Sequence, residues 1–89
     1  MAYQLQLTKA AAKDVPALPQ NVKRRVDAEI LALAERPRPD GVVKLKATSG
    51  GDIWRVRVGD YRILYRIDDA KKIVEIARVL DRKEAYRGL

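Results

Sequence analysis

The sequence contains no cysteine and no histidine. Without cysteine there can be no disulfide bond and no thiolate nucleophile, and without both residue types the usual zinc ligands are missing. Histidine is also the side chain that most often serves as a general base or acid near neutral pH. Catalysis by a Cys–His pair and a structural zinc site are therefore excluded, so that any chemistry has to use other side chains.

Long hydrophobic runs are missing as well. The N-terminus lacks the apolar segment of a signal peptide, and no stretch approaches the roughly 20 apolar residues that a membrane-spanning helix needs. We therefore expect a cytoplasmic protein. The 89 residues contain no internal repeat, and a chain of this length has room for one modest core. This predicts a single domain over residues 1–89.

Basic residues are abundant. There are 19 Lys and Arg against 12 Asp and Glu, which gives a formal net charge of +7 and a pI near 10.0. The excess lies in the second half, because residues 1–43 hold 7 basic and 5 acidic residues, whereas residues 44–89 hold 12 and 7. Such a charge suits a polyanion or an acidic protein partner, although it can also serve solubility alone.

The first part of the chain predicts a short strand followed by a short helix. Tyr3, Leu5 and Leu7 alternate with small or polar residues, which is the pattern of a strand. Thr8 ends this strand and offers an N-cap oxygen to the helix that follows. Because prolines interrupt the helical spacing, we expect this first helix to end before Leu18.

A second helix is predicted to begin with Pro19 at its first position and to stop at the segment Arg36-Pro37-Arg38-Pro39. Its apolar side chains recur at helical spacing, so they form one stripe that needs a sheet to pack on. The stripe consists of Val22, Val26, Ile30 and Leu33.

The second half of the chain predicts that sheet. Segments in which apolar residues alternate with charged ones are separated by a polar, glycine-rich loop and by short turns, of which Asp68-Asp69 marks the last. The predicted strands cover residues 42–45, 53–58, 61–67 and 73–80.

A two-residue connection, Gly59-Asp60, joins two of these strands. Glycine at the first central position of such a loop indicates a type II′ hairpin, which fixes the register of the strands. Because side chains alternate between the faces of a sheet, one face carries the apolar and aromatic side chains, which we assign to the core rather than to stacking on RNA. The pairs expected there are Val58–Tyr61, Val56–Ile63 and Trp54–Tyr65.

Four arginines share the opposite face of the predicted hairpin. Like charges placed directly opposite each other cost about 0.2–1 kcal/mol, so the pair Arg57–Arg62 indicates a requirement other than stability. A guanidinium group is always cationic and matches two phosphate oxygens at once, which points to RNA phosphate. Alternatively, these arginines are ordinary solvated residues bonded to Asp52, Glu75 or a partner's carboxylate. The expected pairs are Arg57–Arg62, Arg55–Leu64 and Ile53–Arg66.

The segment WRVRVGDYRILYRID at residues 54–68, followed by RVLDRKEAY at residues 78–86, resembles the RelE/ParE toxin superfamily. Members commonly show an alternating basic strand, a short turn, a strand of the form Tyr-Arg-apolar-apolar-Tyr, an acidic turn, and an apolar strand leading to a basic segment and a tyrosine. The likeness covers essentially the whole chain. It implies an α+β fold in which an N-terminal strand and a two-helix hairpin pack on a twisted, mainly antiparallel sheet, with a short C-terminal helical segment.

The resemblance also implies an activity. A RelE-like toxin of a type II toxin–antitoxin system is an endoribonuclease that enters the ribosomal A site, cleaves the bound mRNA by attack of a ribose 2′-hydroxyl on the adjacent phosphate, and so inhibits translation. It needs neither metal nor cofactor. Its partners are the ribosome with its RNA, the mRNA, and a cognate RelB-like antitoxin. The C-terminal segment of the antitoxin is expected to fold onto the toxin and to block or displace residues 82–89.

Matching positions carry over as expected site residues. The catalytic residues that the resemblance implies are Arg62, which stabilises the phosphate, with Arg82 and Tyr86 at the C-terminus. Arg55 and Arg57 stand where basic residues contact the substrate. Lys44 and Lys46 flank Leu45 and could also reach RNA, although an exposed strand face explains them equally well.

Cleavage through the 2′-hydroxyl needs a base, an acid and positive charge on the phosphate oxygens, and arginine serves only the last role. The base is then Tyr86, a lysine of depressed pKa such as Lys44 or Lys46, or a carboxylate. We favour Tyr86, because nearby arginines would lower its pKa from near 10. Alternatively, its ring packs on the sheet edge or stacks on a base. Relatives often have a histidine where this chain has Asp81, which bears on the proton transfer.

Two other functions are compatible with the same fold. A ParE-like toxin poisons DNA gyrase and is not a nuclease, and a degenerate member would only bind its antitoxin or RNA. The combination of several arginines with a tyrosine favours the nuclease, because a gyrase-binding protein has no need of a phosphate site beside a tyrosine.

Overall fold

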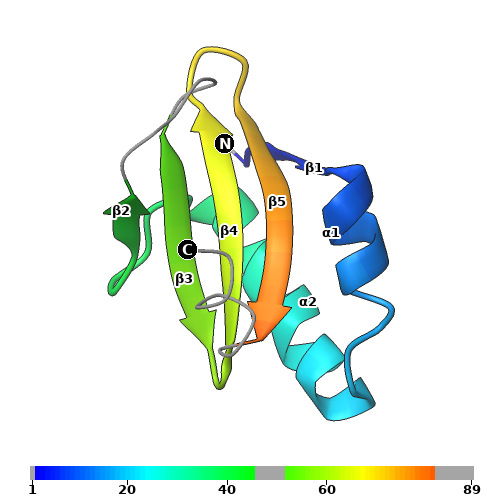
Figure 1. Cartoon of the computed structure of the whole chain (residues 1–89). Helices are drawn as coiled ribbons and strands as arrows, with labels where there is room; N and C mark the ends of the chain where they lie inside the picture. Colours follow the sequence, from blue (N-terminus) through cyan, green and yellow to red (C-terminus); the bar gives the residue numbers. More distant parts are fainter. Residues whose placement is uncertain (1, 46–51, 82–89) are drawn as a thin grey trace.

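The computed structural model describes residues 2–45 and 52–81 of the chain. It has two layers, a five-stranded sheet and two helices that lie on one side of it (Figure 1). This confirms the α+β fold predicted from the sequence; the expected C-terminal helical segment lies outside the described residues. The elements are β1 (Gln4–Leu7), α1 (Lys9–Asp14), α2 (Gln20–Glu35), β2 (Val43–Leu45), β3 (Ile53–Val58), β4 (Tyr61–Asp68) and β5 (Ile73–Asp81).

The two helices begin and end close to where the sequence predicts. The side-chain oxygen of Thr8 accepts a hydrogen bond from the backbone N–H of Ala11 at 3.1 Å, so Thr8 is the N-cap of α1 as expected. Pro19 is the N-cap of α2 and not its first helical residue, one position from the prediction. The stripe on α2 is confirmed, since Val26, Ile30 and Leu33 are buried and Val22 packs against them.

The strands lie in the order β1-β5-β4-β3-β2. β1 runs parallel to β5 and the other neighbours are antiparallel, which agrees with the prediction of a mainly antiparallel sheet. The pairing of β4 with β5 shifts by one residue: Leu64 faces Arg78, but Tyr65 faces Ile76. Ala77 is therefore an extra residue in β5, and this bulge changes which side chains meet beyond it.

The core lies between α2 and the sheet. Tyr65 of β4 is fully buried among apolar side chains, and its hydroxyl donates a hydrogen bond to the backbone carbonyl of Pro37 at 2.7 Å. Burial raises the pKa of Tyr65 to about 12. Trp54 packs against this core at its edge, which agrees with the core assignment of both aromatic residues. No helix in residues 2–45 or 52–81 is long and apolar enough to span a membrane.

Candidate nucleic-acid interface

The hairpin of β3 and β4 has the predicted turn and register. Gly59 has φ of +59° and Asp60 has no positive φ, as a type II′ turn requires. The paired stretch stops one pair short of the expected Ile53–Arg66. All other expected pairs are present, namely Trp54–Tyr65, Arg55–Leu64, Val56–Ile63, Arg57–Arg62 and Val58–Tyr61.

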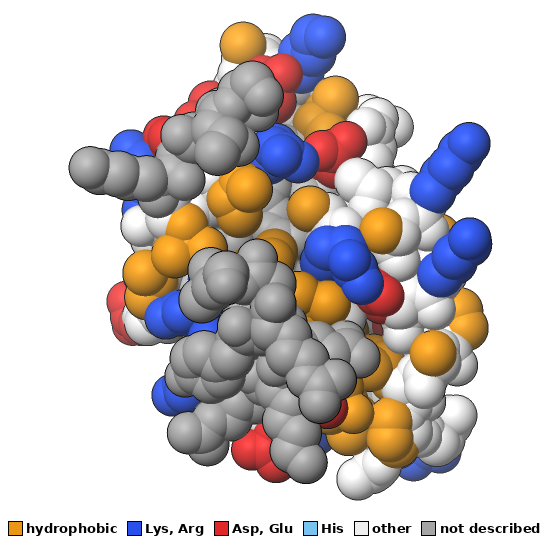
Figure 2. All heavy atoms as spheres, in the orientation of Figure 1, with side chains coloured by type: hydrophobic (Ala, Val, Ile, Leu, Met, Phe, Trp, Pro, Cys, Tyr) orange, Lys and Arg blue, Asp and Glu red, His pale blue; other side chains and the backbone are white. Residues whose placement is uncertain are grey.

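This register places Arg55, Arg57 and Arg62 on the side of the sheet that faces away from the helices, which we call the arginine face. Figure 2 views the molecule from this side and shows Lys and Arg side chains interspersed with hydrophobic ones. Among the described residues, neither Arg55 nor Arg57 forms an ion pair with a carboxylate. Their positive charge is therefore not neutralised within this part of the chain.

Arg62 differs from its two neighbours, because only 8% of its surface is exposed. It is the one buried charged residue in the part of the chain that the structure describes, and it is not without an interaction partner. The alternative of an ordinary solvated arginine is therefore wrong at this position. Arg62 lies on the central strand β4, between β3 and β5, whereas Leu64 and Arg66, on the same face of that strand, are only partly buried.

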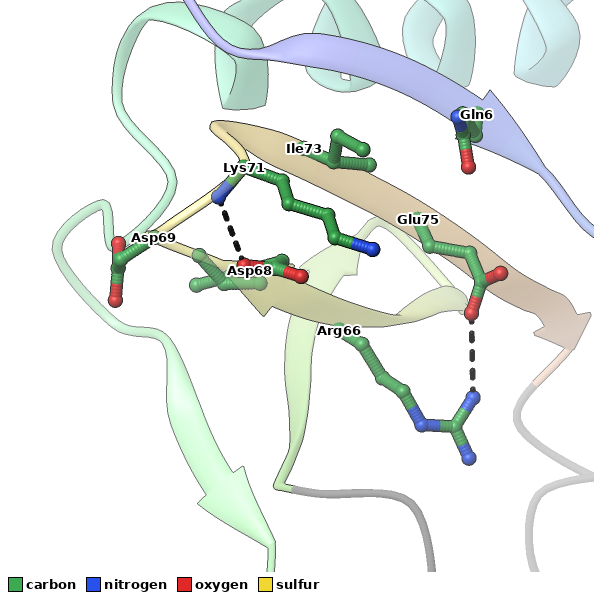
Figure 3. A pocket seen from close by; sticks show the side chains of 8 residues that line it. Gln6, Arg66, Asp68, Asp69, Lys71, Ile73 and Glu75 are labelled. Atoms are coloured by element: carbon green, nitrogen blue, oxygen red, sulfur yellow. Dashed lines mark hydrogen bonds and ion pairs between the residues drawn. The ribbon is translucent and has the colours of Figure 1, made fainter.

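Arg66, the fourth arginine expected on this face, is paired with Glu75 of β5 at 3.5 Å (Figure 3). The alternative of an intramolecular carboxylate partner is therefore confirmed for Arg66. Its Nε is buried without a hydrogen-bond partner. The adjoining pocket, near the β4–β5 turn, is lined by acidic as well as basic side chains, including Asp68 and Lys71. This mixture gives the pocket no clear preference for an anion.

Lys44 is not brought together with the arginines. It pairs with Trp54 across β2 and β3, so its side chain belongs to the opposite face from Arg55. Its ammonium group forms an ion pair with Asp52 at 3.0 Å and lies 5.6 Å from the centre of the Trp54 ring. The position of Lys44 therefore gives no support to its predicted contact with RNA. The other predicted site residues, Lys46, Arg82 and Tyr86, lie outside the described residues.

A cluster that sequence reasoning missed connects the linker between α2 and β2 with the β4–β5 turn. The guanidinium group of Arg38 donates hydrogen bonds to both carboxylate oxygens of Asp69, at 2.8 and 3.3 Å, and Tyr3 donates a third at 2.6 Å. Arg38 also lies over the Trp54 ring, 5.0 Å from its centre. The hydrogen bonds from Arg38 and from Tyr3 hold the pKa of Asp69 at about 2. We call Tyr3, Arg38 and Asp69 the clasp.

Asp14, the last residue of α1, forms a second contact that the sequence did not reveal. It accepts hydrogen bonds from Nε of Arg78 at 2.8 Å and from the backbone N–H of Val79 at 3.0 Å. Burial raises the pKa of Asp14, but the bonds from Arg78 and Val79 outweigh burial and leave the pKa below its usual value. Asp14 therefore fastens α1 to β5 just after the bulge.

The fold and the arginine face define a small α+β protein whose helix-free sheet face is cationic. Comparison with known proteins shows to which family this protein belongs. The model of the ParE toxin family of the type II toxin–antitoxin system parDE matches residues 5–86. The chain thus belongs to the RelE/ParE superfamily of toxins of type II toxin–antitoxin systems, as the sequence resemblance indicated.

Individual relatives agree with this membership. The chain is 31% identical to toxin RelE of Mycobacterium tuberculosis over 86 residues, which cover 96% of this chain and 87% of that protein. It is 33% identical to toxin RelG of the same organism over 88 residues, which cover 98% and 99% of the two chains. The RelE–RelB complex of Pyrococcus horikoshii OT3 contains a chain with a TM-score of 0.80 and 30% identity, covering 92% of this chain and 97% of that one.

Proposed function

We propose that this toxin is an endoribonuclease that cleaves mRNA in the ribosomal A site and so inhibits translation. The observation that carries the proposal is the arginine face: Arg57 and Arg62 are direct cross-strand partners, and Arg55 lies two residues before Arg57 on the same face. Opposed like charges are unfavourable for stability, and a bound phosphodiester would offset this repulsion. Sequence similarity to a toxin named RelE also supports the proposed mRNA cleavage.

In the proposed reaction the ribose 2′-oxygen attacks the adjacent phosphorus while the bond from phosphorus to the 5′-oxygen breaks. The products are a 2′,3′-cyclic phosphate and a free 5′-hydroxyl, so neither metal nor cofactor enters the balance. Arg55 and Arg57 would hold the RNA, and Arg62 with Arg82 would stabilise the charge on the phosphate oxygens. Tyr86 is the proposed base for the 2′-hydroxyl proton, because arginines close to its phenol would favour the phenolate.

A cognate RelB-like antitoxin is the proposed protein partner. The solved P. horikoshii relative is a RelE–RelB complex, and the formal charge of +7 on this chain suits an acidic segment. Apolar anchors would contribute alongside charge, so we expect moderate salt to weaken the complex without dissolving it. Complete dissociation at moderate salt, measured by size-exclusion chromatography, would contradict this form of binding.

The variant Tyr86→Phe tests the proposed base. Loss of the phenol oxygen should lower mRNA cleavage about 100-fold or more, the usual range for a general base, while binding to ribosomes is retained. Primer extension on mRNA from translating ribosomes measures the cuts, and co-sedimentation measures ribosome binding. Cleavage by Tyr86→Phe at the wild-type rate would remove Tyr86 from the reaction.

Gyrase poisoning is the second candidate, because the matched family model carries the name ParE. A DNA supercoiling assay with purified gyrase, run in parallel with primer extension, separates the two functions. We expect cuts at a fixed position within codons and no effect on supercoiling. Loss of supercoiling without cuts would instead identify a gyrase poison, and neither effect would identify a module that only binds its antitoxin or RNA.

A further inference from the structure

Arg25 of α2 lies against the turn of the β3–β4 hairpin. A Cβ built on Gly59 would meet its guanidinium nitrogens at 3.2 and 3.5 Å and its Cζ at 3.6 Å. Arg25 is exposed, and no described carboxylate forms an ion pair with it. The guanidinium group of Arg25 thus lies beside the hairpin turn. It is exposed, and no carboxylate among the described residues neutralises it.

Two depressions meet at this turn and share Arg57 and Gly59. One, on the α2 side, is lined by Arg25 and Glu29 as well as by Ala28 and Val58. The other, on the side of the arginine face, is lined by Arg57, Gly59, Asp60 and Arg62 and has a volume of about 150 Å³. Arg25, Arg57 and Arg62 therefore follow one another around the end of the hairpin.

The charge along this path favours an anion. Arg25, Arg57 and Arg62 line it together with two carboxylates, Glu29 and Asp60. Neither carboxylate forms an ion pair with Arg25 or Arg57, so these two guanidinium groups are not neutralised by the described residues. A chain of phosphates is the anion that matches a row of separate guanidinium groups, because each group can bind one phosphate through two parallel hydrogen bonds.

We propose that the path around the hairpin turn binds the RNA backbone beyond the scissile linkage, with Arg25 contacting a second phosphodiester. This inference rests on the proposed function, since it extends the arginine face past its end. Gly59 has a part in the arrangement, because the absence of a Cβ leaves room for the Arg25 guanidinium close to the turn. Arg25 would be an RNA-binding residue and not a catalytic one.

Charge reversal at Arg25 tests the proposal against a matched control. Arg24 is the preceding residue of α2, is also exposed, and lines neither depression. Arg25→Glu should weaken binding to ribosomes on the order of tenfold and reduce the slope of log affinity against log salt by about 1, as loss of a phosphate contact requires. Arg24→Glu changes the net charge by the same two units, so it should alter the affinity and the salt slope only through the net charge of the protein.

Binding to two kinds of ribosome shows whether Arg25 contacts the mRNA or the ribosomal RNA. If Arg25 contacts the mRNA, Arg25→Glu loses affinity for ribosomes programmed with an mRNA and an open A site, but not for vacant ribosomes. If it contacts ribosomal RNA, both affinities fall equally. Equal binding of Arg25→Glu and Arg24→Glu to both, with unchanged thermal midpoints, overturns the proposal.

The binding test of Arg25 can succeed or fail whether or not the chain cleaves mRNA. A wild-type chain that cuts no mRNA, yet binds ribosomes in a manner that depends on Arg25, would refute the nuclease and leave this binding path intact. A chain that cleaves normally with either substitution, and binds equally, would refute the path and leave the nuclease intact. A wild-type chain that binds no ribosome refutes both.

Discussion

At the scale of single residues, the most informative feature is the direct opposition of Arg57 and Arg62. Arg57 is exposed, whereas Arg62 is buried on the central strand. Two facing cations on neighbouring strands destabilise the pair by about 0.2–1 kcal/mol. On the function proposed above, this arrangement would serve RNA binding at a cost in stability, which is common where a fold carries a functional site.

Replacing Arg57 by glutamine should separate these two properties. Removal of one of the facing charges is expected to increase the free energy of unfolding by about 0.2–1 kcal/mol, which raises the melting temperature by a few degrees in a domain of this size. The same variant should cleave mRNA more slowly. Urea denaturation and primer extension measure the two effects, and the exposed helix variant Arg24→Gln serves as control. A less stable Arg57→Gln would contradict the repulsion argument.

At the scale of elements, the clasp joins segments that are far apart in the sequence. Arg38, in the linker after α2, and Asp69, in the β4–β5 turn, are 31 residues apart, and Tyr3 precedes β1. The clasp therefore fastens the linker between α2 and β2 and the β4–β5 turn to each other and to the N-terminal segment. It also places Arg38 over the ring of Trp54, beside the short edge strand β2.

The clasp should make stability depend on pH in the acid range. The folded pKa of Asp69 is about 2, below the value of about 3.9 for an unfolded aspartate. Between these values the unfolded chain binds more protons, so stability falls as pH falls. The contribution of Asp69 is complete above the unfolded pKa and is lost as pH decreases through the folded one.

The variant Asp69→Asn removes this contribution. Its melting temperature should lie below that of the wild type at about pH 6, and the two should converge as the pH approaches about 2. Asp40→Asn is the control, because Asp40 is exposed and forms no ion pair with the described residues. Melting curves of wild type and Asp69→Asn that stay equally far apart over this range would show that the carboxylate charge is not responsible.

At the scale of the whole molecule, much of the fold was predictable because its signals are local. The N-cap at Thr8, the stripe on α2 and the two-residue turn at Gly59 each act over a few residues. The turn also fixed the register of β3 and β4, which is why the positions of Arg55, Arg57 and Arg62 followed from the sequence.

The contacts of Arg66 and Lys44, which the sequence left open, depend on pairings that no short turn fixes. Arg66 meets Glu75 only because the extra residue Ala77 shifts β5 against β4; without this bulge Arg66 would face Ile76. The face of Lys44 depends on how β2 pairs with β3 across a longer connection, which leaves the register open. The burial of Arg62 and the clasp arise only in the assembled fold, where segments distant in the sequence meet.

The central claim is that the arginine face cleaves mRNA on the ribosome, and the double variant Arg55→Gln/Arg57→Gln tests it most directly. Both residues lack carboxylate partners among the described residues, so the fold should tolerate the change. In primer extension on translating ribosomes, we predict codon-phased cuts by the wild type and a reduction of about 100-fold by the variant, because two charge-assisted contacts that hold the RNA are removed. Equal cutting by a folded double variant, or no cutting by the wild type, would contradict the account.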